Sequence, residues 1–166
     1  VKLEYPTANA DIRSLFVTTT AGSITAREVE NLGARSAVIG SSLRGEVGLD
    51  VICALKEKGI MVAADMQGFV RVLRNEELKY ETWLEMAATL AHVDIVKSDA
   101  VEAEFLTGET DILKAAEFFA AMGPKEILLT HKNGLLIYVG GEAYEIGEPV
   151  EIASTSPGAS SSSSSV

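Results

Sequence analysis

The chain has 166 residues, of which 47% are apolar, so one domain with a sizeable core is expected. Its 24 acidic residues outnumber the 14 basic ones, and the net charge of −10 argues against nucleic acid and anionic membrane surfaces as partners, because both need a basic footprint. The single cysteine, Cys53, excludes an internal disulfide. No apolar run is long enough to span a membrane and no signal peptide opens the sequence, so a cytoplasmic protein is the default expectation.

Strands and helices are predicted to alternate along most of the chain after an irregular start at residues 1–13. Apolar runs between turn residues predict strands at 14–20, 37–40, 60–65, 93–97, 126–130, 135–139 and 143–146. Helices are predicted at 25–32, 49–58, 83–92 and 100–106, followed by one that Thr110 caps and Gly123-Pro124 ends. This order predicts an α/β fold with three layers, in which helices cover both faces of a mostly parallel sheet. Asn133-Gly134 predicts a C-terminal hairpin.

The last residues differ in composition from the rest of the chain. After Ile152 the sequence consists mainly of Ser, Thr, Gly, Ala and Pro, and residues 160–165 are all serine. Such a run buries too little apolar surface to offset the entropy lost on ordering. We therefore divide the chain into a core at 1–152 and a Ser-rich tail at 153–166. The tail is either flexible or a stretch whose true side chains the sequence does not represent.

Charged side chains follow two neighbouring predicted strands. Asp65 and Arg71 follow one strand, and Lys97, Asp99 and Glu102 follow the next. Ligands of open α/β sheets bind beyond the carboxyl ends of the strands, so this pattern predicts a site for a polyanion and its metal. Simpler alternatives are a surface ion pair between Asp65 and Arg71, and a Glu102 that only follows the preference for acids at helix N-termini.

Three segments resemble motifs of the ribokinase-like (PfkB) carbohydrate kinases. Segment 65–71, Asp-Met-Gln-Gly-Phe-Val-Arg, is similar to the strand-end stretch of Asp, Gly and Arg in that family. Segment 97–102, Lys-Ser-Asp-Ala-Val-Glu, is similar to Lys-Pro-Asn-x-x-Glu, and Phe-Leu-Thr-Gly at 105–108 continues the match. Segment 127–134 is similar to the Val-Thr-x-Gly-x-x-Gly strand and turn. The resemblance extends roughly from residue 14 to residue 158 and implies a ribokinase-like, Rossmann-like α/β/α core.

The resemblance implies ATP-dependent phosphorylation of a hydroxyl on a sugar or sugar-like small molecule, with Mg²⁺ as the metal. The implied substrate and phosphate contacts are Asp65, Arg71, Lys97 and Asp99; Thr130 and Gly134 would lie at the nucleotide, and Glu102 would act through the water shell of magnesium. Asp99 stands where the family usually has Asn, and Lys132 stands where it has Gly.

The strongest family signature, Gly-Ala-Gly-Asp, is expected after the terminal hairpin. Gly158 and Ala159 fit it, whereas Ser161 takes the position of the aspartate that acts as general base. Serine has no useful basicity at neutral pH, so the chain as written should transfer phosphate inefficiently. The first part of the family pattern, with a glycine-rich substrate motif and the strands of a small lid, is expected to be missing.

These departures leave alternatives open. The chain is either an incompletely represented kinase, which we favour, or a truncated homologue that binds a nucleotide or metabolite without turnover. A third alternative is a structural α/β domain that assembles with another chain. Family members often pair through their lids, so a homodimer is an open alternative to a monomer.

Overall fold

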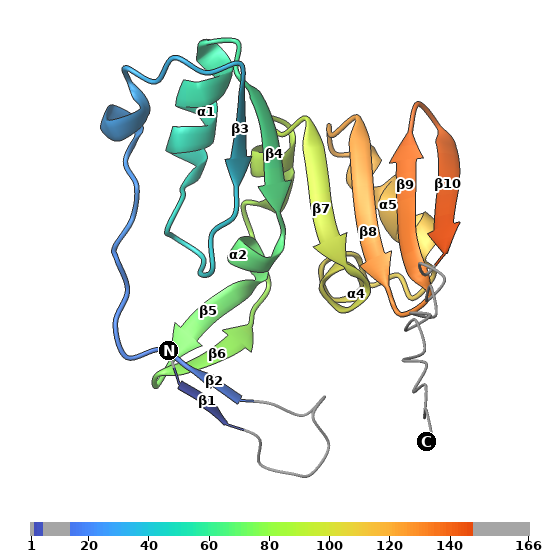
Figure 1. Ribbon diagram of the computed structural model, residues 1–166, viewed down its shortest axis with the longest axis horizontal. Coiled ribbons are helices and arrows are strands. Elements are labelled where there is room, and N and C mark those ends of the chain that lie inside the picture. Colours follow the sequence, from blue (N-terminus) through green and yellow to red (C-terminus); the bar gives the residue numbers. More distant parts are fainter. Residues whose placement is uncertain (1, 5–13, 148–166) are drawn as a thin grey trace, which may run out of the picture.

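The computed structural model describes residues 2–4 and 14–147 of the chain (Figure 1). The predicted boundary between residues 152 and 153 lies outside these residues, as do Gly158, Ala159 and Ser161. Within the described part, none of the helices combines the length and the apolar character that a membrane crossing requires.

A six-stranded sheet with the order β10-β9-β8-β7-β4-β3 forms the centre of the fold (Figure 1). Its four parallel strands are β3 (Ser36–Ile39), β4 (Met61–Asp65), β7 (Ile95–Asp99) and β8 (Glu126–His131). The strands β9 (Gly134–Val139) and β10 (Glu142–Gly147) extend the sheet as an antiparallel hairpin. Helix-containing crossovers connect the parallel strands, as parallel pairing requires. The predicted α/β class, with a mostly parallel sheet and a C-terminal hairpin, is confirmed.

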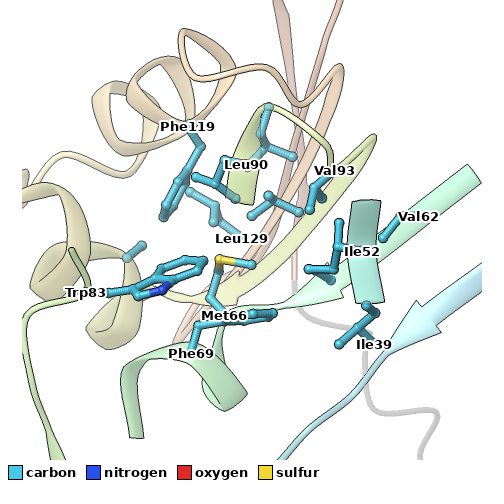
Figure 2. Close-up of a cluster of buried hydrophobic side chains, with 14 of the residues drawn as sticks. Ile39, Ile52, Val62, Met66, Phe69, Trp83, Leu90, Val93, Phe119 and Leu129 are labelled. Carbon is cyan, nitrogen blue, oxygen red and sulfur yellow. The ribbon is translucent and has the colours of Figure 1, made fainter. Parts of the chain in front are cut away.

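Four helices pack against one face of this sheet. They are α1 (Leu49–Glu57), α3 (Met86–Leu90), α4 (Ala100–Thr107) and α5 (Ile112–Ala120). Alternate strand residues such as Val62 and Leu129 point into the same core as Ile52, Leu90 and Phe119 of the helices (Figure 2). On the other face of the sheet, Val38 is 81% exposed. The described residues thus show two of the three predicted layers.

A second, antiparallel sheet was not predicted. Its order is β1-β2-β6-β5, with β1 (Lys2–Glu4), β2 (Ser14–Phe16), β5 (Arg71–Arg74) and β6 (Glu77–Tyr80). It lies below the main sheet in Figure 1, beyond the short helix α2 (Gln67–Val70). The prediction of an irregular start at residues 1–13 is therefore wrong for residues 2–4, which form β1. The turn between β5 and β6 has positive φ at Asn75 (50°) and Glu76 (68°), and a hairpin of this kind is usually signalled by Asn-Gly.

Helix α5 begins one residue later than predicted. Asp111, not Thr110, is the N-cap, because its Oδ1 accepts the amide N–H of Leu113 at 2.9 Å and of Lys114 at 3.3 Å. The helix predicted at 25–32 is a short 3-10 helix, η1 (Ala26–Val29). The helix predicted at 83–92 contracts to α3.

Candidate functional site

The carboxyl ends of β4 and β7 lie side by side, with Asp65 opposite Lys97 in the parallel register. Lys97 Nζ lies 3.0 Å from Asp65 Oδ2, and Asp65 Oδ1 accepts the N–H of Gln67 at 3.1 Å. The Lys97 and Asp65 side chains are 43% and 28% exposed, so a ligand from solvent can reach both. The structure thus brings these two predicted site residues together at the edge where α/β sheets bind ligands.

Helix α4 begins directly at the end of β7 and is closed by a capping box. Asp99 is its N-cap, and Asp99 Oδ1 accepts the N–H of Glu102 at 2.7 Å. Glu102 Oε2 reaches back to the N–H of Asp99 at 3.3 Å. Glu102 is only 1% exposed. Burial raises the pKa of the Glu102 carboxyl, and the neighbouring Asp99 charge raises it further.

Arg71 connects the small sheet to this helix. Its Nη2 lies 3.4 Å from Glu102 Oε1, and the Arg71 side chain is 17% exposed. The alternative of a surface ion pair between Asp65 and Arg71 is therefore wrong, since each pairs with a different residue. Arg71 thus places a largely buried guanidinium against Glu102, in the first turn of the helix that follows β7.

Tyr80 belongs to the same cluster, although sequence reasoning did not identify it. It stands opposite Arg71 in the β5–β6 register, and its ring meets Phe105 of α4 edge-on at 5.4 Å between centroids. Burial raises the pKa of the Tyr80 phenol and the Glu102 carboxylate raises it further, whereas Arg71 lowers it. Tyr80 could have been placed here only by predicting the β5–β6 hairpin. The turn residues Asn75 and Glu76 lack the Asn-Gly signal of such a hairpin.

The end of β8 brings in further predicted residues. Thr130 pairs with Asp99 in the β7–β8 register, and Thr130 Oγ1 donates to the carbonyl oxygen of Ser98 at 3.4 Å. A cavity of about 300 Å³ lies here, lined by Asp99, Ala100, Val101, Thr130, His131 and Lys132. Gly134 starts β9 with φ of 138°, and a Cβ there would lie 2.0 Å from the carbonyl oxygen of Ile146. The hairpin itself therefore accounts for this glycine.

A second cavity, of about 270 Å³, opens between the small sheet and the loop from β3 to α1. Arg71 lines it together with Thr19, Thr20, Ser42 and Glu46. Glu46 Oε2 accepts the N–H of Ser42 at 2.7 Å, which fixes the carboxylate in the loop. Glu46 belongs to none of the sequence motifs, although its loop follows the carboxyl end of β3, where ligands are expected.

Among residues 2–4 and 14–147, no group of three His, Cys, Asp or Glu side chains is arranged to hold a metal ion. Both Glu102 oxygens already face protein donors, Arg71 Nη2 and the N–H of Asp99. Magnesium keeps several waters and uses few protein carboxylates, so contact of Glu102 with a hydrated ion stays a prediction.

The parallel sheet, its one-sided helices and the charged strand ends define an α/β domain with a candidate anion-binding edge. Comparison with known structures makes the class more specific. A pyrophosphate-dependent kinase of the ribokinase family, in complex with sulfate, is 33% identical with a TM-score of 0.78, over 84% of this chain and 50% of that one. A pyrophosphate-dependent myo-inositol-1 kinase converted into a myo-inositol-3 kinase is 34% identical with a TM-score of 0.76, over 81% and 48%.

Ribokinase of Arabidopsis thaliana, in complex with ribose and ATP, shares the fold at 21% identity and a TM-score of 0.53, over 74% of this chain and 37% of that one. The predicted resemblance to the ribokinase-like (PfkB) kinases is confirmed, and this chain spans about half the length of the kinases it matches. No family model matches the sequence, and no curated protein matches it.

Proposed function

We propose that this chain is part of a kinase that transfers a phosphoryl group to a hydroxyl of a sugar or sugar-like small molecule. The observation that carries the proposal is the likeness, at 33–34% identity over more than four-fifths of the chain, to pyrophosphate-dependent kinases of the ribokinase family. The charged groups at the ends of β4 and β7 supply suitable chemistry for such a reaction.

Phosphoryl transfer demands positive groups against the phosphate oxygens and little covalent work from the protein. We assign that part to Lys97 and Arg71, because Lys97 lies near the carboxyl end of β7, Arg71 lies against the start of α4, and each is held by a carboxylate. Asp65 orients Lys97 by their 3.0 Å contact, and Glu102 orients Arg71. Arg71 can also meet a phosphate with two parallel N–H donors.

The remaining assignments follow the family pattern. We propose that Asp99 and Thr130 border the donor phosphates and that Gly134 lies behind them, while the backbone around Gly158 and Ala159 binds the anion formed during transfer. Ser161 cannot serve as the general base at neutral pH, so the acceptor proton must pass to another group.

Two donors fit the proposal. The sequence motifs predict ATP with Mg²⁺, whereas the two kinases of 33–34% identity use pyrophosphate. Lys132 stands where the family motif has glycine and lines the cavity beyond β7 and β8. An added cation there favours a compact, highly charged donor, so we propose pyrophosphate as the first donor to test and ATP as the second.

A non-catalytic binding module is the second candidate function, and Ser161 at the position of the base is the observation that favours it. The deciding experiment follows pyrophosphate or ATP by ³¹P NMR in the presence of a panel of sugars and cyclic polyols, after intact mass spectrometry of the protein. Consumption of the donor that depends on the acceptor supports the kinase. Saturable donor binding without turnover supports the binding module. If the protein neither consumes nor binds either donor, both candidate functions are wrong.

A further inference from the structure

Arg44, on the loop between β3 and α1, is hydrogen-bonded to both ends of the chain segment that forms β5 and β6. Its Nε donates to the Phe69 carbonyl oxygen at 2.6 Å, its Nη1 to that of Thr82 at 2.9 Å, and its Nη2 to that of Glu81. Its backbone N–H donates to the Arg71 carbonyl oxygen at 2.8 Å. One residue therefore binds four carbonyls where the chain leaves the main body and where it returns.

The residues on the main-body side of the Arg44 contacts are closely packed. Phe69 and Trp83 stack with their ring centroids 4.6 Å apart, and they are 4% and 7% exposed (Figure 2). The N–H of Glu81 donates to the Val70 carbonyl oxygen at 3.1 Å and joins the two passing chains directly. On the other side of the Arg44 contacts, the hairpin of β5 and β6 projects away from the main sheet (Figure 1). The Arg44 contacts thus lie at the level where a packed core gives way to a projecting hairpin.

Only arginine suits this position. The three side-chain bonds use three different nitrogens of one planar guanidinium, and a lysine ammonium cannot reproduce that fork. Removal from water lowers the pKa of Arg44, which agrees with a side chain committed to backbone acceptors. Arg44 makes no ion pair within 4.0 Å in the described residues, so its contacts here are to main-chain oxygens.

The first residue pair of the hairpin is Arg71 opposite Tyr80, and both residues contact α4. We propose that Arg44 is a positioning residue, which holds the base of the hairpin so that Arg71 stands against Glu102 and faces the phosphate. This inference rests on the proposed function for the role of Arg71. A small tilt at the base would move Arg71 along α4, and misplacement by about 1 Å can cost on the order of a hundredfold in rate.

The first test is independent of activity and uses amide hydrogen exchange on the full-length protein with Arg44→Lys. We expect the amides of residues 71–80 to exchange about tenfold faster, because hydrogen bonds at the hairpin base are lost, and those of α5 to be unchanged. Arg74→Ala is the matched control, since Arg74 lies on the same hairpin but binds the exposed carboxylate of Glu81 instead (Nε to Oε1, 2.6 Å). Unchanged exchange in Arg44→Lys would overturn the proposal.

The second test is a double-mutant cycle on the phosphoryl-transfer rate. Arg44→Lys alone should lower kcat about tenfold or more, and it should cause no further loss in an Arg71→Ala background, because it acts through Arg71. Losses that multiply would show that Arg44 acts by another route and would overturn the proposal. If the wild-type protein transfers no phosphate, the proposed function fails, and hydrogen exchange alone decides whether Arg44 positions the hairpin.

Discussion

Arg71 Nη2 lies 3.4 Å from Glu102 Oε1, and this contact joins the small antiparallel sheet to the main α/β body. Glu102 is almost fully buried and Arg71 is 17% exposed. Two charges withdrawn from water depend on each other, because the loss of either leaves the other without compensation. The contact therefore couples the stability of the fold to the chemistry proposed for its edge.

Replacing Arg71 should impair both properties. Arg71→Ala leaves the Glu102 carboxylate buried without its cation, so we expect the free energy of unfolding to fall by about 3 kcal/mol. The transfer rate should fall on the order of a hundredfold or more, because one preorganised positive group is lost. Urea denaturation and steady-state kinetics measure the two effects. Arg74→Ala, at an exposed arginine of the same strand, is the control, and an Arg71→Ala enzyme with the kcat of wild type would contradict the assignment.

The raised pKa of Glu102 predicts how stability depends on pH. A carboxyl whose pKa is higher in the folded than in the unfolded state binds more protons when folded, so its contribution to stability falls as pH rises through the unfolded value of 4.5. Glu102→Gln removes this titration while it keeps an oxygen for the helix cap. The unfolding free energy of wild type minus that of the variant should therefore decrease as the pH rises above 4.5. A flat or rising difference would count against the burial of Glu102.

Gly68 is expected to tolerate no side chain. A Cβ at this position in α2 would lie 1.9 Å from Ser41 Oγ and 2.5 Å from the Ser41 carbonyl oxygen. Gly68→Ala should therefore cost about 1–3 kcal/mol through overpacking, against the gain in helix propensity. Gly40→Ala is the matched control, because a Cβ at Gly40 would have no neighbour within 4 Å. Equal denaturation midpoints for the two variants would disprove the close approach of α2 to the Ser41 loop.

The cap of α5 distinguishes two adjacent residues. Asp111→Ala should lower the free energy of unfolding by about 1 kcal/mol, because the amides of Leu113 and Lys114 lose their acceptor. Thr110→Ala should change it by less than about 0.5 kcal/mol. Thermal denaturation of both variants is the measurement, and a larger effect at Thr110 would favour the cap expected from the sequence.

The amino-acid sequence by itself determined the main sheet and the residues that gather at its edge. The apolar runs of β4, β7 and β8 are local signals, since alternate residues such as Val62, Val96 and Leu129 must be apolar to pack against the helices. The order of strands and helices then requires adjacent carboxyl ends, which places Asp65, Lys97 and Asp99 near one another.

The tertiary structure alone decided which charged groups pair and which unmarked residues join the site. Arg71 meets Glu102 rather than Asp65 because the helix α2 lies between the end of β4 and Arg71, which begins β5. Tyr80 and Arg44 carry no motif, and their positions follow from strand register and from backbone carbonyls distant in sequence. Hydrogen bonds and ion pairs act only over a few ångströms, so contacts between segments far apart in the chain are set by packing and not by local sequence.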